Sequence, residues 1–300
     1  MNLFVTGVCG RLGRAIAAEA SARGMTVVGL DITDWPAELD RPARIALHEG
    51  SCEDFSSVER LLDGCDAMIH TAGPHAGFLG TLDLAGFLEG NVVVTARLLE
   101  IALKAGVKGV NLASTMEILG GRDWASSGAA CLDEQSTPRT DSAYSLSRLL
   151  TENLAREFSR QHGLATSCIR YSGFGYVPDE ELGPRLLART ASPGDVARAT
   201  ILAATRFDLR GDVFVIAPEA PHTIADMVTA LTDPHAVVEK YFPGASAILA
   251  AQGQALQSTN FWPITDTRKA RLMLGWRAEL TFEKWLQMHG WTRPARPSDH

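Results

Sequence analysis

Short apolar segments alternate with longer amphipathic patterns through the first two thirds of the chain. Segments typical of β-strands span residues 3–6, 26–30, 44–48, 67–70, 109–113 and 165–171. Patterns with helical spacing of apolar residues span residues 12–23, 58–62, 87–105 and 144–162. Strands that alternate with helices pair in parallel, and the helices cover both faces of the sheet. We therefore predict an α/β fold with a doubly wound parallel sheet.

The pattern loosens after residue 171 into Gly, Pro and acidic residues, and a new helix is predicted to begin near Pro193. A further strand is predicted at residues 213–216. We expect an α/β body and a smaller C-terminal lobe. The predicted body comprises residues 1–171 and 193–218, the predicted lobe comprises residues 172–192 and 219–291, and a flexible tail is predicted at residues 292–300.

Composition narrows the class of protein. The chain has 300 residues, of which 46% are hydrophobic, so it can bury a large core. Five widely spaced cysteines without a C-x-x-C pair suggest neither a disulfide framework nor a metal site. A net charge of −7 without a basic cluster argues against nucleic acid as a partner. With no apolar run of about 18 residues and no room for a leader before the first strand, no membrane partner is expected and the cytoplasm is the predicted location.

A glycine-rich turn follows the first predicted strand. Residues 6–13 read Thr-Gly-Val-Cys-Gly-Arg-Leu-Gly, a G-x-x-G-x-x-G motif that runs into a helix. Gly7 permits the tight turn, Gly10 lets backbone N–H groups approach a pyrophosphate, and Gly13 allows close packing of helix and strand. Such turns are common, but this one lies between a strand and a helix. We predict a dinucleotide site that also includes Arg11 and Leu12.

An acidic residue ends the second predicted strand. A carboxylate at Asp31 can accept both adenosine ribose hydroxyls and would repel a 2′-phosphate, which favours NAD over NADP. Two alternatives remain: Asp31 as a turn or capping residue, and Arg11 as the partner of a 2′-phosphate. Asp54 is predicted either to accept from an adenine amino group or to cap a helix. Further predicted cofactor contacts follow later strands: Ser51, Cys52, Thr71, Ala72, Gly73, Tyr144, Arg148 and Tyr171.

Three side chains have the chemistry of a proton relay. Thr115 follows the fifth predicted strand, and Tyr144 and Arg148 are four residues apart, so they share one face of a helix. The hydroxyl can orient a substrate oxygen, the phenol can exchange its proton, and the cation favours the phenolate. We predict that these three are catalytic and that hydride moves to or from a nicotinamide. The alternative for Tyr144 is a packing role on an amphipathic helix.

These motifs together resemble the extended short-chain dehydrogenase/reductase family, in its NAD-dependent epimerase/dehydratase branch. The resemblance extends to Ile-Arg-Tyr at residues 169–171, Asp-Val-Ala at 195–197, and Leu-Gly-Trp at 274–276. It implies a Rossmann-type NAD-binding domain, a small substrate lobe, and a homodimer joined through the helices predicted at 87–105 and 144–162. It also implies that Tyr144 is the general acid or base and that Thr115 orients the substrate.

Arg148 departs from the family motif, which has lysine at this position to bond the nicotinamide ribose and to tune the tyrosine. Arginine keeps its positive charge and offers more donors, but it cannot shed a proton. One interpretation is an active enzyme that tolerates arginine, in a chain where only five of 28 basic residues are lysine. The other is a non-catalytic NAD-binding sensor or scaffold, although Tyr144 and Thr115 are both retained.

The substrate is predicted to be a sugar, a sugar acid or a related polyol. Nucleotide-sugar enzymes of the family carry Asn after the sixth strand, where this chain has Ser172. Predicted substrate contacts are His75, Thr115, Met116, Ser172, Gly173 and Phe174, with the region of Phe261 and Trp262 as either substrate wall or lobe core. The reaction is predicted to be that of a dehydrogenase, or alternatively that of a nucleotide-sugar epimerase that retains NAD. A dehydratase ranks last, because Met116 stands where such enzymes commonly have Asp.

Overall fold

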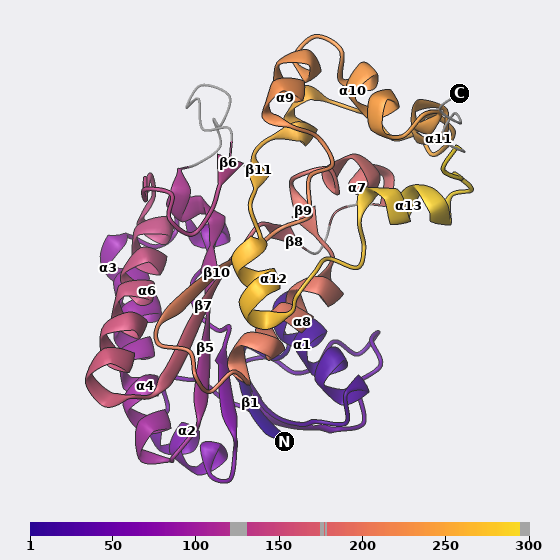
Figure 1. Ribbon diagram of the computed structural model, residues 1–300. Helices are drawn as coiled ribbons and strands as arrows, with labels where there is room; N and C mark the ends of the chain where they lie inside the picture. Colours follow the sequence, from indigo (N-terminus) through magenta and orange to yellow (C-terminus); the bar gives the residue numbers. More distant parts are fainter. Residues whose placement is uncertain (121–130, 175–176, 178, 295–300) are drawn as a thin grey trace.

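The computed structural model describes residues 1–120, 131–174, 177 and 179–294. Its centre is a sheet of seven parallel strands in the order β10-β7-β5-β4-β1-β2-β3 (Figure 1). The strands are β1 (Asn2–Thr6), β2 (Thr26–Asp31), β3 (Ile45–Glu49), β4 (Ala67–His70), β5 (Gly109–Thr115), β7 (Ala165–Tyr171) and β10 (Asp212–Ile216). The predicted strands agree with these bounds to within two residues, and the doubly wound parallel sheet is confirmed.

Helices cover both faces of the sheet, and a separate apolar core lies on each side. Three of them pack on one face: α1 (Arg11–Ala22), α8 (Pro193–Ala204) and α12 (Arg268–Leu274). The other face carries α2 (Phe55–Leu62), α4 (Val94–Lys104) and α6 (Ala143–His162), grouped together in Figure 1. Helix α6 begins at a reciprocal cap in which Ser142 and Ser145 each accept from the backbone N–H of the other. This cap sets the first residue of the helix at Ala143, directly before Tyr144.

The helix predicted at residues 87–105 is more complex than its apolar pattern indicates. Helix α3 (Leu84–Leu88) continues through a π-helical turn, η2 (Glu89–Val93), into α4. A π turn inserts an extra residue, and such turns recur at functional sites. Here it holds the buried Asn91, whose Nδ2 donates to the Pro74 carbonyl (3.0 Å) and to Ser147 Oγ (2.9 Å). The turn therefore ties the helix to the loop after β4 and to α6.

Short elements above the sheet form a smaller lobe. Its core includes Phe242, Phe261, Phe282 and Trp285. The elements are α7 (Asp179–Arg185), α9 (Ile224–Ala230), α10 (Pro234–Tyr241), α11 (Ala245–Ala251) and α13 (Phe282–Met288). The described residues also form short strands and 3-10 turns: β6 (Cys131–Leu132), β8 (Gly173–Phe174), β9 (Thr190–Ala191), β11 (Ile264–Thr265), η1 (Ala76–Phe78), η3 (Met116–Leu119) and η4 (Ser258–Phe261).

Asp195 joins the C-terminal part of the chain to the body. Its buried carboxylate accepts from the N–H groups of Glu279 (2.7 Å) and Leu280 (3.0 Å), and its carbonyl accepts from Trp276 Nε1. The division into body and lobe stays a prediction, and α12, which lies inside the predicted lobe, packs on β10 and α8. Of the predicted tail, residues 295–300 lie outside the described residues. No helix in the described part of the chain is long and apolar enough to cross a membrane.

Candidate active site

A cleft of about 1450 Å³ opens at the carboxyl ends of the parallel strands. The residues predicted from the sequence as catalytic, cofactor or substrate contacts lie in its wall, apart from Asp54, Phe261 and Trp262, for which the sequence also predicts another role. They meet there because residues that follow parallel strands converge at one edge of a sheet, where ligands bind in open α/β folds. The convergence is a finding, whereas the role of each side chain stays a prediction.

The glycine turn is shaped for close approach of a ligand. Gly7 has φ of 71°, a conformation that favours glycine. A Cβ on Gly13 would lie 2.1 Å from the Gly7 carbonyl oxygen, so α1 packs against the turn at a distance that only glycine allows. The N-cap of α1 is Gly10, which has no side chain to cover the N–H groups of the first turn. These N–H groups form a site suited to an anion.

Asp31 braces the glycine turn from the end of β2. Its carboxylate accepts from the N–H of Cys9 (2.8 Å) and from the N–H and hydroxyl of Thr33 (3.1 and 3.0 Å). A carboxylate has about four acceptor sites, so capacity remains for a ribose hydroxyl. Of the two predictions for Asp54, the structure supports the cap: it accepts from the N–H of Ser57 (3.2 Å) at the start of α2. Asp54 does not line the cleft, and hydrogen bonds from Ser57 and Ser56 lower the pKa of its carboxyl to about 2.

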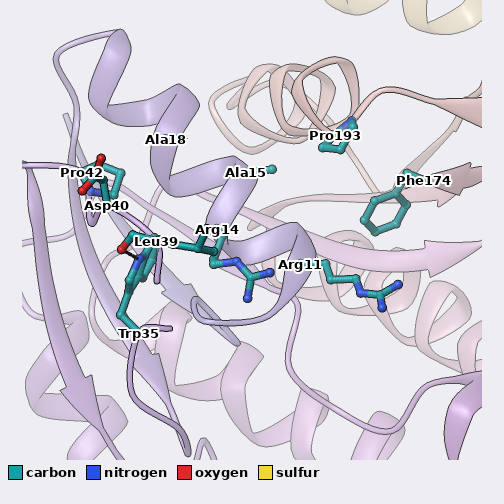
Figure 2. A pocket seen from close by; sticks show the side chains of 10 residues that line it. All are labelled: Arg11, Arg14, Ala15, Ala18, Trp35, Leu39, Asp40, Pro42, Phe174 and Pro193. Carbon is teal, nitrogen blue, oxygen red and sulfur yellow. Dashed lines mark hydrogen bonds between the residues drawn. The ribbon is translucent and has the colours of Figure 1, made fainter. Parts of the chain in front are cut away.

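Arg11 stands between the cleft and a second, smaller hollow. This hollow of about 380 Å³ lies outside α1, between Arg14, Trp35 and Leu39 on one side and Phe174 on the other (Figure 2). Arg11 lines both spaces and is exposed at the first residue of α1. The neighbouring Arg14 donates through Nη1 to the Cys9 carbonyl (2.5 Å), which adds a second brace to the glycine turn.

The three predicted catalytic residues stand together in the cleft. Thr115 ends β5, and its Oγ1 accepts from the N–H of Glu117 (3.1 Å), which leaves its own O–H to donate. The guanidinium carbon of Arg148 lies 5.7 Å from the centre of the Tyr144 ring. Tyr144 is 9% exposed and Arg148 is 3% exposed, so the cation lies near the tyrosine ring in a largely buried position.

Arg148 is held by two backbone carbonyls, one in β5 and one in the loop after β4. Nη1 donates to the Ala113 carbonyl (3.1 Å) and Nη2 donates to the Pro74 carbonyl (3.4 Å). Nε has no hydrogen-bond partner among the described residues. Arginine has five N–H groups, so donors remain for a ligand in the cleft. The Pro74 carbonyl also accepts from Asn91, so the π turn and Arg148 hold the same loop.

Two histidines lie near the cleft, His70 beneath it and His75 in its wall. His70 is 1% exposed beneath the cleft, and its Nδ1 lies 2.7 Å from Thr6 Oγ1. This burial and the contact with Thr6 give His70 a packing role. His75 lines the cleft and caps η1 by accepting from the N–H of Gly77 (3.0 Å). Partial burial, and then the positive charges of Arg148 and Arg11, lower the pKa of His75.

The lobe contributes a wall that differs from the predicted one. Phe261 is fully buried in the lobe core and Trp262 packs against it, so the lobe-core alternative holds for both. The cleft is instead lined by Pro263 and Thr265, which follow directly. The reason is that an aromatic side chain at a domain edge has the same sequence signal whether it faces a ligand or a core.

Two further groups line the cleft without having been assigned a role. The exposed side chain of Arg189 has no hydrogen bond or ion pair within the described part of the chain, whereas its backbone N–H donates to the Arg185 carbonyl (2.8 Å). Partial desolvation, and then repulsion from Arg185, lower the pKa of its guanidinium. Ser114 Oγ also belongs to the cleft wall but donates to a buried carboxylate behind it. No local pattern singles out either residue.

The NAD dependent epimerase/dehydratase family is the family whose sequence model matches the chain, over residues 3–189. The match covers more than half of the chain, including the glycine turn, Asp31 and the Thr115–Tyr144–Arg148 group. The chain belongs to this family. The resemblance drawn from the motifs is thus confirmed.

Relatives of this epimerase/dehydratase family member include several sugar enzymes. UDP-glucose 4-epimerase from Azospirillum brasilense is 24% identical over 172 residues, which are 57% of this chain and 48% of the epimerase. The chain therefore spans about half the length of that relative. Uronate dehydrogenase from Pseudomonas syringae pv. tomato is 25% identical over 202 residues, which are 66% of this chain and 67% of the dehydrogenase.

The fold is shared with solved protein structures. A short-chain dehydrogenase/reductase superfamily protein from Agrobacterium tumefaciens, solved with bound NAD, superposes with a TM-score of 0.71. It is 21% identical, and the alignment covers 96% of each chain. At this identity the likeness shows the fold, an α/β fold with a Rossmann-type parallel sheet.

Proposed function

We propose that this family member is an NAD-dependent oxidoreductase that acts on a hydroxyl or carbonyl group of a sugar, a sugar acid or a related polyol. The observation that carries the proposal is the meeting of Thr115, Tyr144 and Arg148 in one cleft with the glycine turn and Asp31. The cleft combines an anion site with an adjacent phenol and hydroxyl, as hydride transfer to an oriented carbonyl requires.

The residues present fit NAD. The uncapped first turn of α1 would hold the pyrophosphate, because its N–H groups have no side-chain partner. Asp31 would accept from the adenosine ribose, and Arg148 would donate to the nicotinamide ribose with the N–H groups that the backbone leaves unused. When bound, NAD supplies the hydride acceptor or donor. The close contact at Gly13 keeps α1 and the turn in the geometry that this binding needs.

The proton moves at Tyr144 in this proposal. Its phenolic oxygen takes the proton of a substrate hydroxyl in oxidation and returns it in reduction. Arg148 places a permanent positive charge beside the phenol, so it can stabilise a phenolate without losing a proton itself. Thr115 donates to the same substrate oxygen through the O–H that its bond from Glu117 leaves available.

An acidic substrate is favoured over a neutral one. Arg185 and Arg189 line the lobe side of the cleft, and Arg185 is already paired with Glu181. The side chain of Arg189 has no partner among the described residues, so a carboxylate on the substrate would pair with it. A sugar acid therefore suits the cleft, and the uronate dehydrogenase relative acts on such a compound by its name.

Two properties of the whole protein complete the proposal. We propose a homodimer formed through α4 and α6, where Val93 at the end of η2, Leu103 on α4 and Leu150 on α6 are exposed apolar residues. We also propose the cytoplasm as the location, because all five cysteines are free.

The test uses purified protein, NAD and a panel of uronates, neutral sugars and nucleotide sugars. Accumulation of NADH with the uronates is the expected result, product without NADH would identify an epimerase, and NAD binding without product would identify a sensor. Tyr144→Phe is expected to lose turnover and to retain NAD affinity. Tyr241→Phe is the matched control, since that hydroxyl bonds Asp226 in the lobe. Normal turnover by Tyr144→Phe would refute its role.

A further inference from the structure

One face of α6 carries three functional groups on successive turns. Tyr144, Arg148 and Glu152 are each four residues apart, so they form one row along the helix. Tyr144 and Arg148 line the cleft, whereas Glu152 is 1% exposed and lies behind it. A buried carboxylate is costly unless it is paired, so the partners of Glu152 identify what it holds.

Glu152 is bonded to two neighbouring strands of the sheet. Ser114 Oγ donates to Oε1 of Glu152 (2.6 Å). Arg170 donates to both oxygens, from Nε to Oε1 (2.9 Å) and from Nη2 to Oε2 (2.8 Å). Arg170 is itself 3% exposed, so this is a bidentate ion pair shielded from water. Ser114 and Arg170 are partners in the register of β5 and β7.

The next pair in that register forms part of the cleft. Thr115 of β5 lies opposite Tyr171 of β7, and both line the cavity. The side chain of Ser114 therefore links the strand end that carries Thr115 to the helix that carries Tyr144. The bond connects residues 38 positions apart in the chain, so it sets how the helix and the strand end sit relative to each other.

We propose that Glu152 is a positioning residue for the reaction: through Ser114 and Arg170 it sets the placement of Thr115 relative to Tyr144. The inference rests on the proposed function, because it gives Glu152 a role in that same site. A general acid and an orienting hydroxyl must reach the same substrate oxygen, and a displacement of an ångström is enough to slow such a reaction greatly. A bond at the residue directly before Thr115 limits that displacement.

The decisive variant is Ser114→Ala. It removes the hydroxyl and leaves the Glu152–Arg170 ion pair intact, whereas loss of Glu152 would leave Arg170 buried without a counter-charge and is expected to prevent folding. The matched control is Ser159→Ala. Ser159 lies on the same helix, is 1% exposed, and donates to the Leu164 carbonyl (2.6 Å), but it does not line the cleft.

Steady-state kinetics separate a positioning role from a structural one. Ser114→Ala is expected to lower kcat on the order of tenfold while the KM for NAD stays unchanged. Ser159→Ala is expected to change neither constant, even if it lowers the Tm. A folded Ser114→Ala protein with the kcat and KM of the wild type would overturn the positioning role and leave the proposed function standing.

A second measurement tests the positioning role of Glu152 if the proposed function itself fails. If the wild type binds NAD but turns over no sugar, deuterium exchange of the amides of residues 113–119 decides the positioning role. Faster exchange in Ser114→Ala than in the wild type and in Ser159→Ala would support it. Equal exchange in all three proteins would overturn it.

Discussion

At the scale of single residues, burial beneath the cleft decides which charges the folded protein can hold. His70 ends β4 with its ring fully enclosed, and burial, followed by the positive charge of Arg148, lowers its pKa from 6.5 to about 3. The folded protein therefore keeps His70 neutral. Arg148 is held in place by two backbone carbonyls that accept its N–H groups.

The lowered pKa of His70 predicts that the protein loses stability in acid. Between pH 6.5 and about 3 the unfolded chain binds a proton at this histidine that the folded chain does not, so the unfolding free energy falls as the pH falls. The slope due to His70 approaches about 1.4 kcal/mol per pH unit. Urea denaturation across this interval is expected to show a shallower slope for His70→Gln. The exposed His48→Gln is the control, and a His70→Gln slope equal to that of the wild type would contradict the prediction.

At the scale of elements, contacts between segments decide the local geometry of the helices more than the helix propensities of their residues do. Helix α1 can lie against the turn after β1 only because Gly13 has no side chain. The π turn η2 likewise depends on a contact, since Asn91 is held by the Pro74 carbonyl and by Ser147. Neither feature changes the apolar period of its helix by enough to be recognised in a sequence.

Gly13→Ala is expected to disturb α1 and the cofactor site together. The added Cβ would stand 2.1 Å from the Gly7 oxygen, so the helix must shift, at a cost of about 1–3 kcal/mol in unfolding free energy. We expect a lower Tm and a Kd for NAD raised by more than about tenfold, a change equal to about 1.4 kcal/mol. In Gly194→Ala the nearest atom to the new Cβ is 4.0 Å away, so that variant should bind NAD normally. Normal NAD binding by Gly13→Ala would show that the close packing is dispensable.

At the scale of the whole molecule, the two faces of the sheet have different surroundings. The face with α1, α8 and α12 carries the junction through Asp195 (Figure 1). The face with α4 and α6 leaves Val93, Leu103 and Leu150 exposed at 54%, 37% and 37%. Apolar groups of this kind on two adjacent long helices suit an interface with a second copy of the chain.

Light scattering after size exclusion is expected to give twice the chain mass of 32.3 kDa. Leu150→Glu would place a charge on the α6 face and is expected to shift the protein to the monomer. Leu272→Glu alters a more exposed leucine, 80% accessible, on α12 of the opposite face, and should leave the dimer intact. A monomeric wild type would refute the predicted interface.

The chain's own sequence determined the order of strands and helices, the glycine turn, and which residues gather at the cleft. It could do so because Gly7, Asp31 and Thr115 each occupy a strand end, and parallel strands bring their ends to one edge. Only the tertiary structure decided that Asp54 caps a helix and that Phe261 belongs to the lobe core.

Only the tertiary structure likewise decided the link from Glu152 to Ser114 and Arg170, which are 38 and 18 residues away along the chain. Local periodicity reports which face of a segment is buried, but not which side chain of another segment that face will meet. Hydrogen bonds and ion pairs between distant segments exist only once the packed sheet and helix bring their atoms within about 3 Å of each other.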